Sequence, residues 1–331
     1  MNRRKLFQSG AAFAGAAALP AASTVPLREK FFGCIAGVPV GSSMGALVEN
    51  WSWRRIRKEH GTLTRLLPYE HYRKGRRREP ATTGDGVEQQ KLRITAIIEK
   101  QDRIDAEDLR AVWVRGIRAP AMAKTQIAAA STGKYTDSSG LVSMFRSCHP
   151  IGLLNAGDPE APVDSVIGAV FDHCDRGDGR LVRSMGVRGE LERAIRLADS
   201  SQDFKELRRK FDDIYSGRGI PYSNSYANEV VSKGIAIFRL ARGSLYDARI
   251  AAVNFGRGAD CLAAVAAGIS GALSGGESMP AELVEQVDRA TKLNPHTNSQ
   301  RTIRETSAGM YNAYRARLER LRRFVADMER A

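Results

Sequence analysis

The most constraining feature of the chain is a glycine-rich turn that carries one acid and runs straight into a helix of small residues. The turn spans residues 254–261 and contains Asp260, and the following segment, Ala263 to Leu273, is mostly alanine and glycine. Small side chains let the backbones of two helices approach closely. We therefore expect this helix to lie at the centre of the fold, with its first turn facing a buried site.

A second acid-bearing turn lies far upstream. It spans residues 82–86, contains Asp85 and precedes another helical segment. Two such turns, each opening a helix, could bring oxygen ligands to a metal site between helices. Each turn offers only one carboxylate. Aspartate is also a common helix N-cap, so capping is the alternative role of Asp85 and Asp260.

Helical periodicity dominates the rest of the chain, and strand signals are scarce. Asp105 is expected to cap a helix with apolar residues spaced over 109–117, and Ser201 to cap one with an apolar stripe over 204–214. Further helices are expected at Val87–Gln101, at Asn228–Ala241 and from Met310 to Met328. The last has an arginine-rich face, and we expect its apolar stripe to pack on the core. No repeat or linker divides the chain, so residues 27–331 are predicted to form one all-α domain.

The N-terminus has the composition of an export signal. Arg3 and Arg4 precede an apolar, alanine-rich run over residues 11–19. This pattern is typical of a twin-arginine signal peptide, here residues 1–22, and the run is too short to span a bilayer as a stable helix. The alternative is an ordinary disordered terminus. The signal predicts an extracytoplasmic protein, periplasmic or secreted, without a transmembrane segment.

The chain is strongly basic, with a formal net charge of +14. Such a field attracts polyanions and would also steer a substrate that carries a diphosphate. Nucleic-acid binding would call for aromatic platforms or a known module among the charges, and none is found, so we expect no specific nucleic-acid partner. The four cysteines have no zinc-site spacing.

Four blocks in order along the chain resemble the ADP-ribosylglycohydrolase family, over most of residues 30–310. They are residues 32–49, residues 83–85 (where the family usually carries Thr-Asp-Asp-Thr), residues 140–152 and residues 256–261 (where it reads Gly-Gly-Asp-Thr-Asp-Thr). The resemblance implies an all-α, single-domain orthogonal helical bundle. It also implies hydrolysis of a glycosidic bond to ribose, with paired magnesium ions that hold the ribose hydroxyls and the attacking water.

The departures from the family fall on its metal ligands. The resemblance assigns metal-ligand roles to Thr83, Asp85 and Asp260. Gly84 and Gly258 stand where further acids are expected, and Cys261 stands where a threonine oxygen is expected. Magnesium prefers oxygen ligands to sulfur. The remaining ligands predict a weakened site that holds one magnesium ion rather than two.

The resemblance also assigns catalytic roles to Glu49 and Asp85. Glu49 follows the apolar residues 46–48, which suits a partly desolvated carboxylate; a helix-surface glutamate is the alternative. Substrate-binding roles are implied for Gly140, Ser143, Arg146 and Gly256. Arg146 has the alternative of pairing with an acid rather than touching substrate. His149 has no partner spacing of a catalytic base and is interpreted as structural.

Three functions therefore compete at this point. The first is an exported hydrolase of an ADP-ribosyl or related ribosyl conjugate, small or protein-linked, with a weakened magnesium site. The second is a catalytically inactive relative that binds a nucleotide-like ligand. The third is a basic protein that binds anionic polymers. The retained Asp85, Asp260 and Glu49 favour the hydrolase, and the glycines at 84 and 258 favour the inactive relative.

Overall fold

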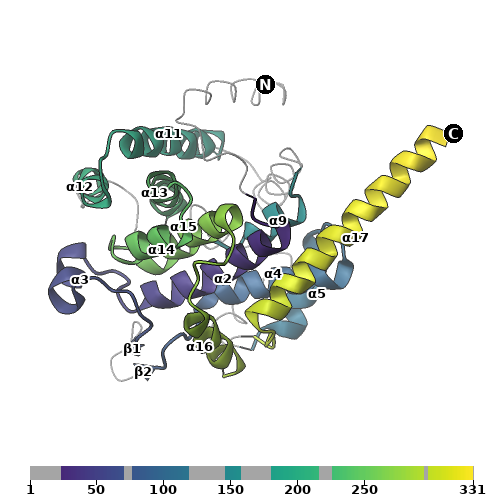
Figure 1. The fold of residues 1–331 in the computed structure, drawn as a ribbon, viewed down its shortest axis with the longest axis horizontal. Helices are drawn as coiled ribbons and strands as arrows, with labels where there is room; N and C mark the ends of the chain where they lie inside the picture. Colours follow the sequence, from purple (N-terminus) through teal and green to yellow (C-terminus); the bar gives the residue numbers. More distant parts are fainter. Residues whose placement is uncertain are drawn as a thin grey trace.

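The chain folds as an all-α structure (Figure 1). The structure is a computed structural model, and it describes residues 24–70, 77–118, 146–157, 180–215, 226–293 and 297–330, with only the backbone of residues 180–188. The helices are α2 (Leu27–Ala46), α3 (Trp53–His60), α4 (Asp85–Lys100), α5 (Ala106–Gly116), α9 (His149–Leu154), α11 (Arg180–Asp199), α12 (Phe204–Tyr215), α13 (Ala227–Leu240), α14 (Leu245–Val253), α15 (Ala259–Ser274), α16 (Ala281–Lys292) and α17 (Ile303–Arg330). The strands β1 (Tyr69–Glu70) and β2 (Arg77–Arg78) form one antiparallel pair.

The centre of the fold is the antiparallel pair of α2 and α15. Glycines recur every fourth residue on the facing side of α2, from Gly33 to Gly45, and meet small residues every fourth position of α15. A Cβ at Gly37 would lie 2.5 Å from the carbonyl oxygen of Ala267, and one at Gly41 would lie 2.6 Å from that of Ala263. The two backbones are therefore in direct contact. The prediction of a central small-residue helix is confirmed, since most of α15 is buried.

The remaining helices surround this pair. On one side α13 and α14 pack against α15, and α11 packs against α13 (Figure 1). On the other side α4, α16 and α17 contact α2, and α9 lies against α4, α15 and α17. One large apolar cluster fills the space between these elements. The candidate site residues lie at the end of the central pair where α2 ends and α15 begins.

Most of the expected helices are present within a residue or two of their predicted bounds. Asp105 caps α5 as expected, through a reciprocal capping box with Asp108. The prediction for Ser201 is wrong. Its hydroxyl donates back to the carbonyl of Leu197, and Asp203 instead accepts the backbone N–H of Glu206 at the start of α12.

Helix α17 is longer than expected and is only partly packed. It begins at Ile303, and its first half buries Met310 and Ala313 against the core. Its second half projects beyond the other helices (Figure 1), and Phe324 and Met328 are more than half exposed. The expectation that the whole apolar stripe packs on the core is therefore wrong, because the core ends before the helix does.

Two sequence expectations fall on residues outside the described ranges. They are the export signal at residues 1–22 and the substrate-binding roles of Gly140 and Ser143. None of the helices in the described ranges combines the length and the apolar composition needed to cross a membrane.

Candidate functional site

The first acid-bearing turn leads directly into α4. Gly84 is the N-cap residue, with extended backbone angles of φ −90° and ψ 176°, and Asp85 is the first helical residue. The Asp85 side chain is about half exposed, at 55%. Because the N-cap is a glycine, Asp85 is not the cap that the alternative interpretation expected. Its carboxylate faces the site while still lying at the positive end of the helix dipole.

The second turn is held against the segment that follows α2. Gly256 has a left-handed φ of 91°, and a Cβ on it would lie 2.8 Å from the backbone nitrogen of Trp53. Next to it, the backbone N–H of Arg257 donates to the carbonyl of Trp51 at 2.8 Å, and the Arg257 side chain pairs with Glu229 on α13. Gly256 thus has a clear structural role, in which its missing side chain allows the close turn. Its predicted contact with substrate stays a prediction.

The two turns meet at the guanidinium of Arg146. Its Nη2 atom donates to Asp85 Oδ1 at 2.8 Å, and its Nη1 atom lies 3.1 Å from Asp260 Oδ2. Nη1 also lies 3.0 Å from the sulfur of Cys261. Residues from α4, α15 and the third sequence block therefore converge on one group. Arg146 therefore pairs with both acids, and its predicted contact with substrate stays a prediction.

Burial governs the charges at this point. Burial raises the pKa of Asp260, the negative charge of Glu49 raises it further, and Arg146 opposes both. The pKa of the Cys261 thiol is raised well above its usual range, chiefly by burial and then by Asp260, so the thiol is protonated at neutral pH. Burial works against the charged form of Arg146, but the negative charges of Asp85 and Asp260 hold the pKa of the guanidinium above its ordinary range. Arg146 is thus a fixed positive charge.

The backbone around Arg146 is tied to α4. The amide of Gln90 lies 3.5 Å from the carbonyl oxygen of Arg146, and a ring nitrogen of His149 lies 3.1 Å from the same oxygen. The buried Arg93 donates to both the carbonyl and the hydroxyl of Ser147, each at 2.5 Å. His149 is half-buried among these groups, and the structural interpretation of its role fits this position.

Glu49 and Tyr69 belong to the same neighbourhood. Glu49 is half-buried just beyond the end of α2, and its charge acts on both Asp260 and Cys261. Burial raises the pKa of Tyr69 to about 12; Arg78 opposes this, while Asp260 and Glu49 reinforce it. Tyr69 also donates its hydroxyl to the carbonyl of Thr82, beside the first turn. No pattern in the sequence would have picked out Tyr69.

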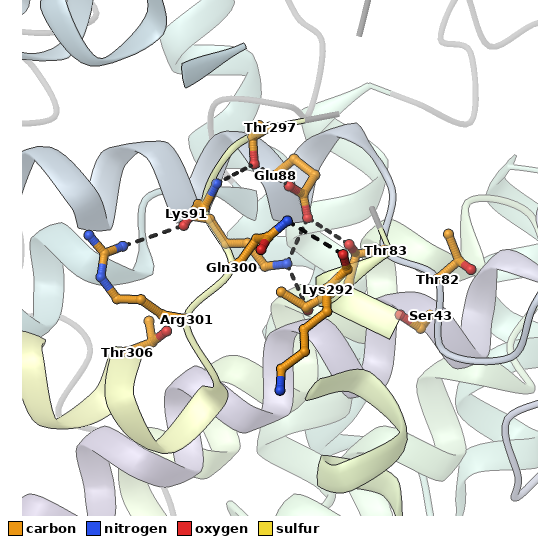
Figure 2. A network of polar contacts seen from close by, with 12 residues as sticks. Ser43, Thr82, Thr83, Glu88, Lys91, Lys292, Thr297, Gln300, Arg301 and Thr306 are labelled. Atoms are coloured by element: carbon orange, nitrogen blue, oxygen red, sulfur yellow. Dashed lines mark hydrogen bonds and ion pairs between the residues drawn. The ribbon is translucent and has the colours of Figure 1, made fainter. Parts of the chain in front are cut away.

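The side chain of Thr83 is hydrogen-bonded within a buried network around Glu88 (Figure 2). Its hydroxyl donates to Glu88 Oε1 at 2.6 Å, and Lys91 and Thr297 donate to the same carboxylate at 2.7 and 2.5 Å. Thr83 and Glu88 are both completely buried. This network anchors the first turn of α4 to the segment before α17. Glu88 was missed in the sequence, where it looks like an ordinary helix acid.

As they stand, these side chains do not fit a magnesium ion. One carboxylate oxygen of Asp85 and one of Asp260 are bound to Arg146, a cation that would repel a second one. Cys261 is a protonated thiol, and the Thr83 hydroxyl donates to Glu88. Within the described ranges no three His, Cys, Asp or Glu side chains are grouped closely enough to hold a metal ion. Magnesium therefore stays a prediction from the resemblance alone.

Comparisons with known proteins agree with the sequence blocks. The ADP-ribosylglycohydrolase family model matches residues 23–316. A solved structure titled "ADP-ribosylglycohydrolase-related protein complex" is similar in fold, with a TM-score of 0.58 and 17% sequence identity, and the match covers 88% of this chain and 98% of that one. A search of curated proteins finds no match. The match to the family model spans most of the sequence, and this chain therefore belongs to the ADP-ribosylglycohydrolase family.

Proposed function

We propose that this protein hydrolyses the glycosidic bond between ribose and its attached group in an ADP-ribosyl or related ribosyl conjugate. The observation that supports this most is the convergence of Asp85 and Asp260, 175 positions apart, on one guanidinium beside Glu49. Family membership supports glycoside hydrolysis in general. The ribosyl group can be attached through an N- or O-glycosidic bond, to a small molecule or to a protein, and a panel of conjugates distinguishes these substrates.

Carboxylates suit this chemistry because the transition state places positive charge on the sugar ring. The half-exposed Asp85 can lie beside that charge, or can accept a proton from the attacking water. Glu49, half-buried near Asp260, is the second candidate base. Asp260 is buried and bound to Arg146, so its role is to orient Arg146 and to accept a ligand hydroxyl.

The test is release of ADP-ribose from a panel of conjugates that includes one N-glycosidic and one O-glycosidic linkage. Asp85→Asn and Glu49→Gln are expected to lower kcat by about 100-fold or more, the usual size of a lost general-base contribution. Asp327→Asn, in the projecting part of α17, is the matched control and should leave the rate unchanged. Wild-type turnover that survives both site variants would contradict the assignment. Binding of ADP-ribose without any turnover would favour the inactive ligand-binding alternative.

We also propose that the protein acts outside the cytoplasm. The support is the Arg3-Arg4 pair before the apolar run in residues 1–22. Fusion of these residues to a reporter tests the proposal. Replacing both arginines with lysine should block export, and export that continues unchanged would refute the twin-arginine interpretation.

A further inference from the structure

The guanidinium of Arg146 lies between the carboxylates of the two acid-bearing turns. We propose that this guanidinium is the built-in cation of the site, so that Asp85 and Asp260 bind the hydroxyl groups of the ribosyl ligand directly, without a magnesium ion. The proposal rests on the function proposed above for the identity of the ligand. Its metal-binding test needs neither turnover nor ligand.

The first support is the direction of the hydrogen bonds. The two terminal nitrogens of Arg146 each reach a different aspartate, one on α4 and one on α15. A magnesium ion between the same carboxylates would need their oxygens at about 2.1 Å and would want a near-octahedral shell of oxygen around it. Instead, the cation between the carboxylates is part of the chain. The guanidinium joins the two helix ends as a bridging ion would.

The second support is the space made for the guanidinium. Gly86, in the first turn of α4, lies so close that a Cβ on it would be 1.8 Å from Arg146 Nε and 2.1 Å from Cζ. No other residue type fits at position 86 while Arg146 stays in place. The backbone that carries Arg146 is also held in place, because Gln90 and Arg93 on α4 contact the carbonyl oxygens of Arg146 and Ser147. Arg146 is 5% exposed and is therefore part of the built site.

The third support is an acceptor that has no partner. Asp260 is 93% buried, at 7% exposure, and its Oδ1 atom has no hydrogen-bond partner among the described residues. A buried carboxylate oxygen in this state costs free energy unless a donor reaches it. Asp85, half exposed at the edge of the same group, lies where a ligand can reach it from solvent. Two carboxylates and one guanidinium leave a net negative charge, which favours hydroxyl donors such as a ribose diol over a phosphate.

The experiment titrates the full chain by calorimetry with magnesium chloride alone, and separately with ADP-ribose in the presence of a chelator or of excess magnesium. For wild type we expect no magnesium binding tighter than millimolar, and an ADP-ribose affinity that changes by less than about twofold between the two conditions. Arg146→Gln should weaken ADP-ribose binding in chelator by about tenfold or more, the size of one lost charge-assisted interaction. Arg323→Gln, on the exposed face of α17, is the matched control and should change neither titration.

The converse test removes the positive charge of Arg146 and adds a carboxylate that can bind magnesium. Gly84 has φ −90° and open space around its Cβ position, so aspartate fits there without strain. The double variant Arg146→Gln with Gly84→Asp should gain magnesium binding, and Gly84→Asp alone should gain less because Arg146 still occupies the site. If Arg146→Gln does not fold, Gly86→Ala displaces the guanidinium while keeping its charge and is expected to weaken ADP-ribose binding in the same direction.

Micromolar magnesium binding by wild type, or ADP-ribose binding that requires magnesium, would overturn the proposal. The wild-type metal titration decides this by itself, whatever the variants do. If ADP-ribose fails to bind under either condition, the proposed function fails on its ligand, and the absence or presence of magnesium binding still settles the role of Arg146.

Discussion

The close contact of α2 and α15 makes a sharp prediction for the stability of the fold. Gly41 faces Ala263 across this contact, and an added Cβ would lie 2.6 Å from the Ala263 carbonyl oxygen and 2.9 Å from its carbon. Ordinary contact begins at 3.4 Å, so in Gly41→Ala the helices must separate by about 0.8 Å locally. The clashing atoms belong to the backbone and cannot rotate away.

The expected free-energy change follows from two opposing effects. Alanine in place of glycine within a helix stabilises by about 1 kcal/mol. Overpacking costs about 1–3 kcal/mol, and the upper part of this range applies because the obstacle is main chain. Gly41→Ala should therefore lose about 2 kcal/mol net. Gly189 supplies the control, since it also lies within a helix but has nothing within 4 Å of its Cβ position. Gly189→Ala should gain about 1 kcal/mol from propensity alone.

The assay is urea unfolding followed by circular dichroism, with the slope of the transition checked for equality among the three proteins. A separation of about 3 kcal/mol between the two variants corresponds to about 5 °C in Tm for a domain of about 300 residues. A Gly41→Ala protein as stable as Gly189→Ala would show that the two helices do not touch at this point, and the reasoning about the central pair would fail.

Two further predictions concern buried ionisable groups. Glu88→Gln removes the buried negative charge to which Lys91, Thr83 and Thr297 donate, and it should lower the free energy of unfolding in urea by about 2–4 kcal/mol. The control is Glu107→Gln, which breaks an exposed pair of the same sequence spacing with Arg110 and should leave stability almost unchanged. Equal losses of stability in the two variants would refute the role of burial. Burial lowers the pKa of His149 below its usual 6.5, so its contribution to stability is full above that pH and is lost as pH falls through the lower folded-state value. The urea midpoint of wild type should therefore fall more steeply than that of His149→Gln between about pH 7.5 and about pH 5.5, and parallel curves would show that His149 does not titrate in this way.

The helices and the central position of α15 were predictable from the sequence for a physical reason. Apolar spacing of three and four residues and runs of alanine and glycine are local patterns, and they report which face of a helix is buried. The cap of α5 followed in the same way from Asp105. At α12 the sequence offers Ser201 and Asp203 within three positions, and only the geometry shows that Asp203 accepts the helix N–H.

The arrangement within the site could be predicted only in part. The acids of the two turns were identified from their place before helices, and pairing of Arg146 with an acid was one of two alternatives. Asp85 lies 61 positions before Arg146 in the sequence, and Asp260 lies 114 positions after it. That one long side chain reaches both aspartates depends on the tertiary fold, which no local sequence pattern shows. Nothing in the local pattern marks Gly86 as the residue that makes room for it. The apolar spacing along α17 likewise predicts which face of the helix is apolar, but it does not show how far along the helix the core extends.

The glycine spacing of α2 connects the stability of the fold to the geometry of the site. Because α2 and α15 are antiparallel, the last glycine of the series, Gly45, lies at the first turn of α15, where a Cβ would be 2.5 Å from the carbonyl oxygen of Ala259 and 2.6 Å from the Cα of Asp260. Glu49 lies four residues after Gly45, in the turn that follows α2. The backbone contact that packs the two central helices therefore also sets the separation of Glu49 and Asp260. Arg146 then links Asp260 to Asp85 on α4, so the carboxylates on all three helix ends are positioned by one glycine series and one guanidinium.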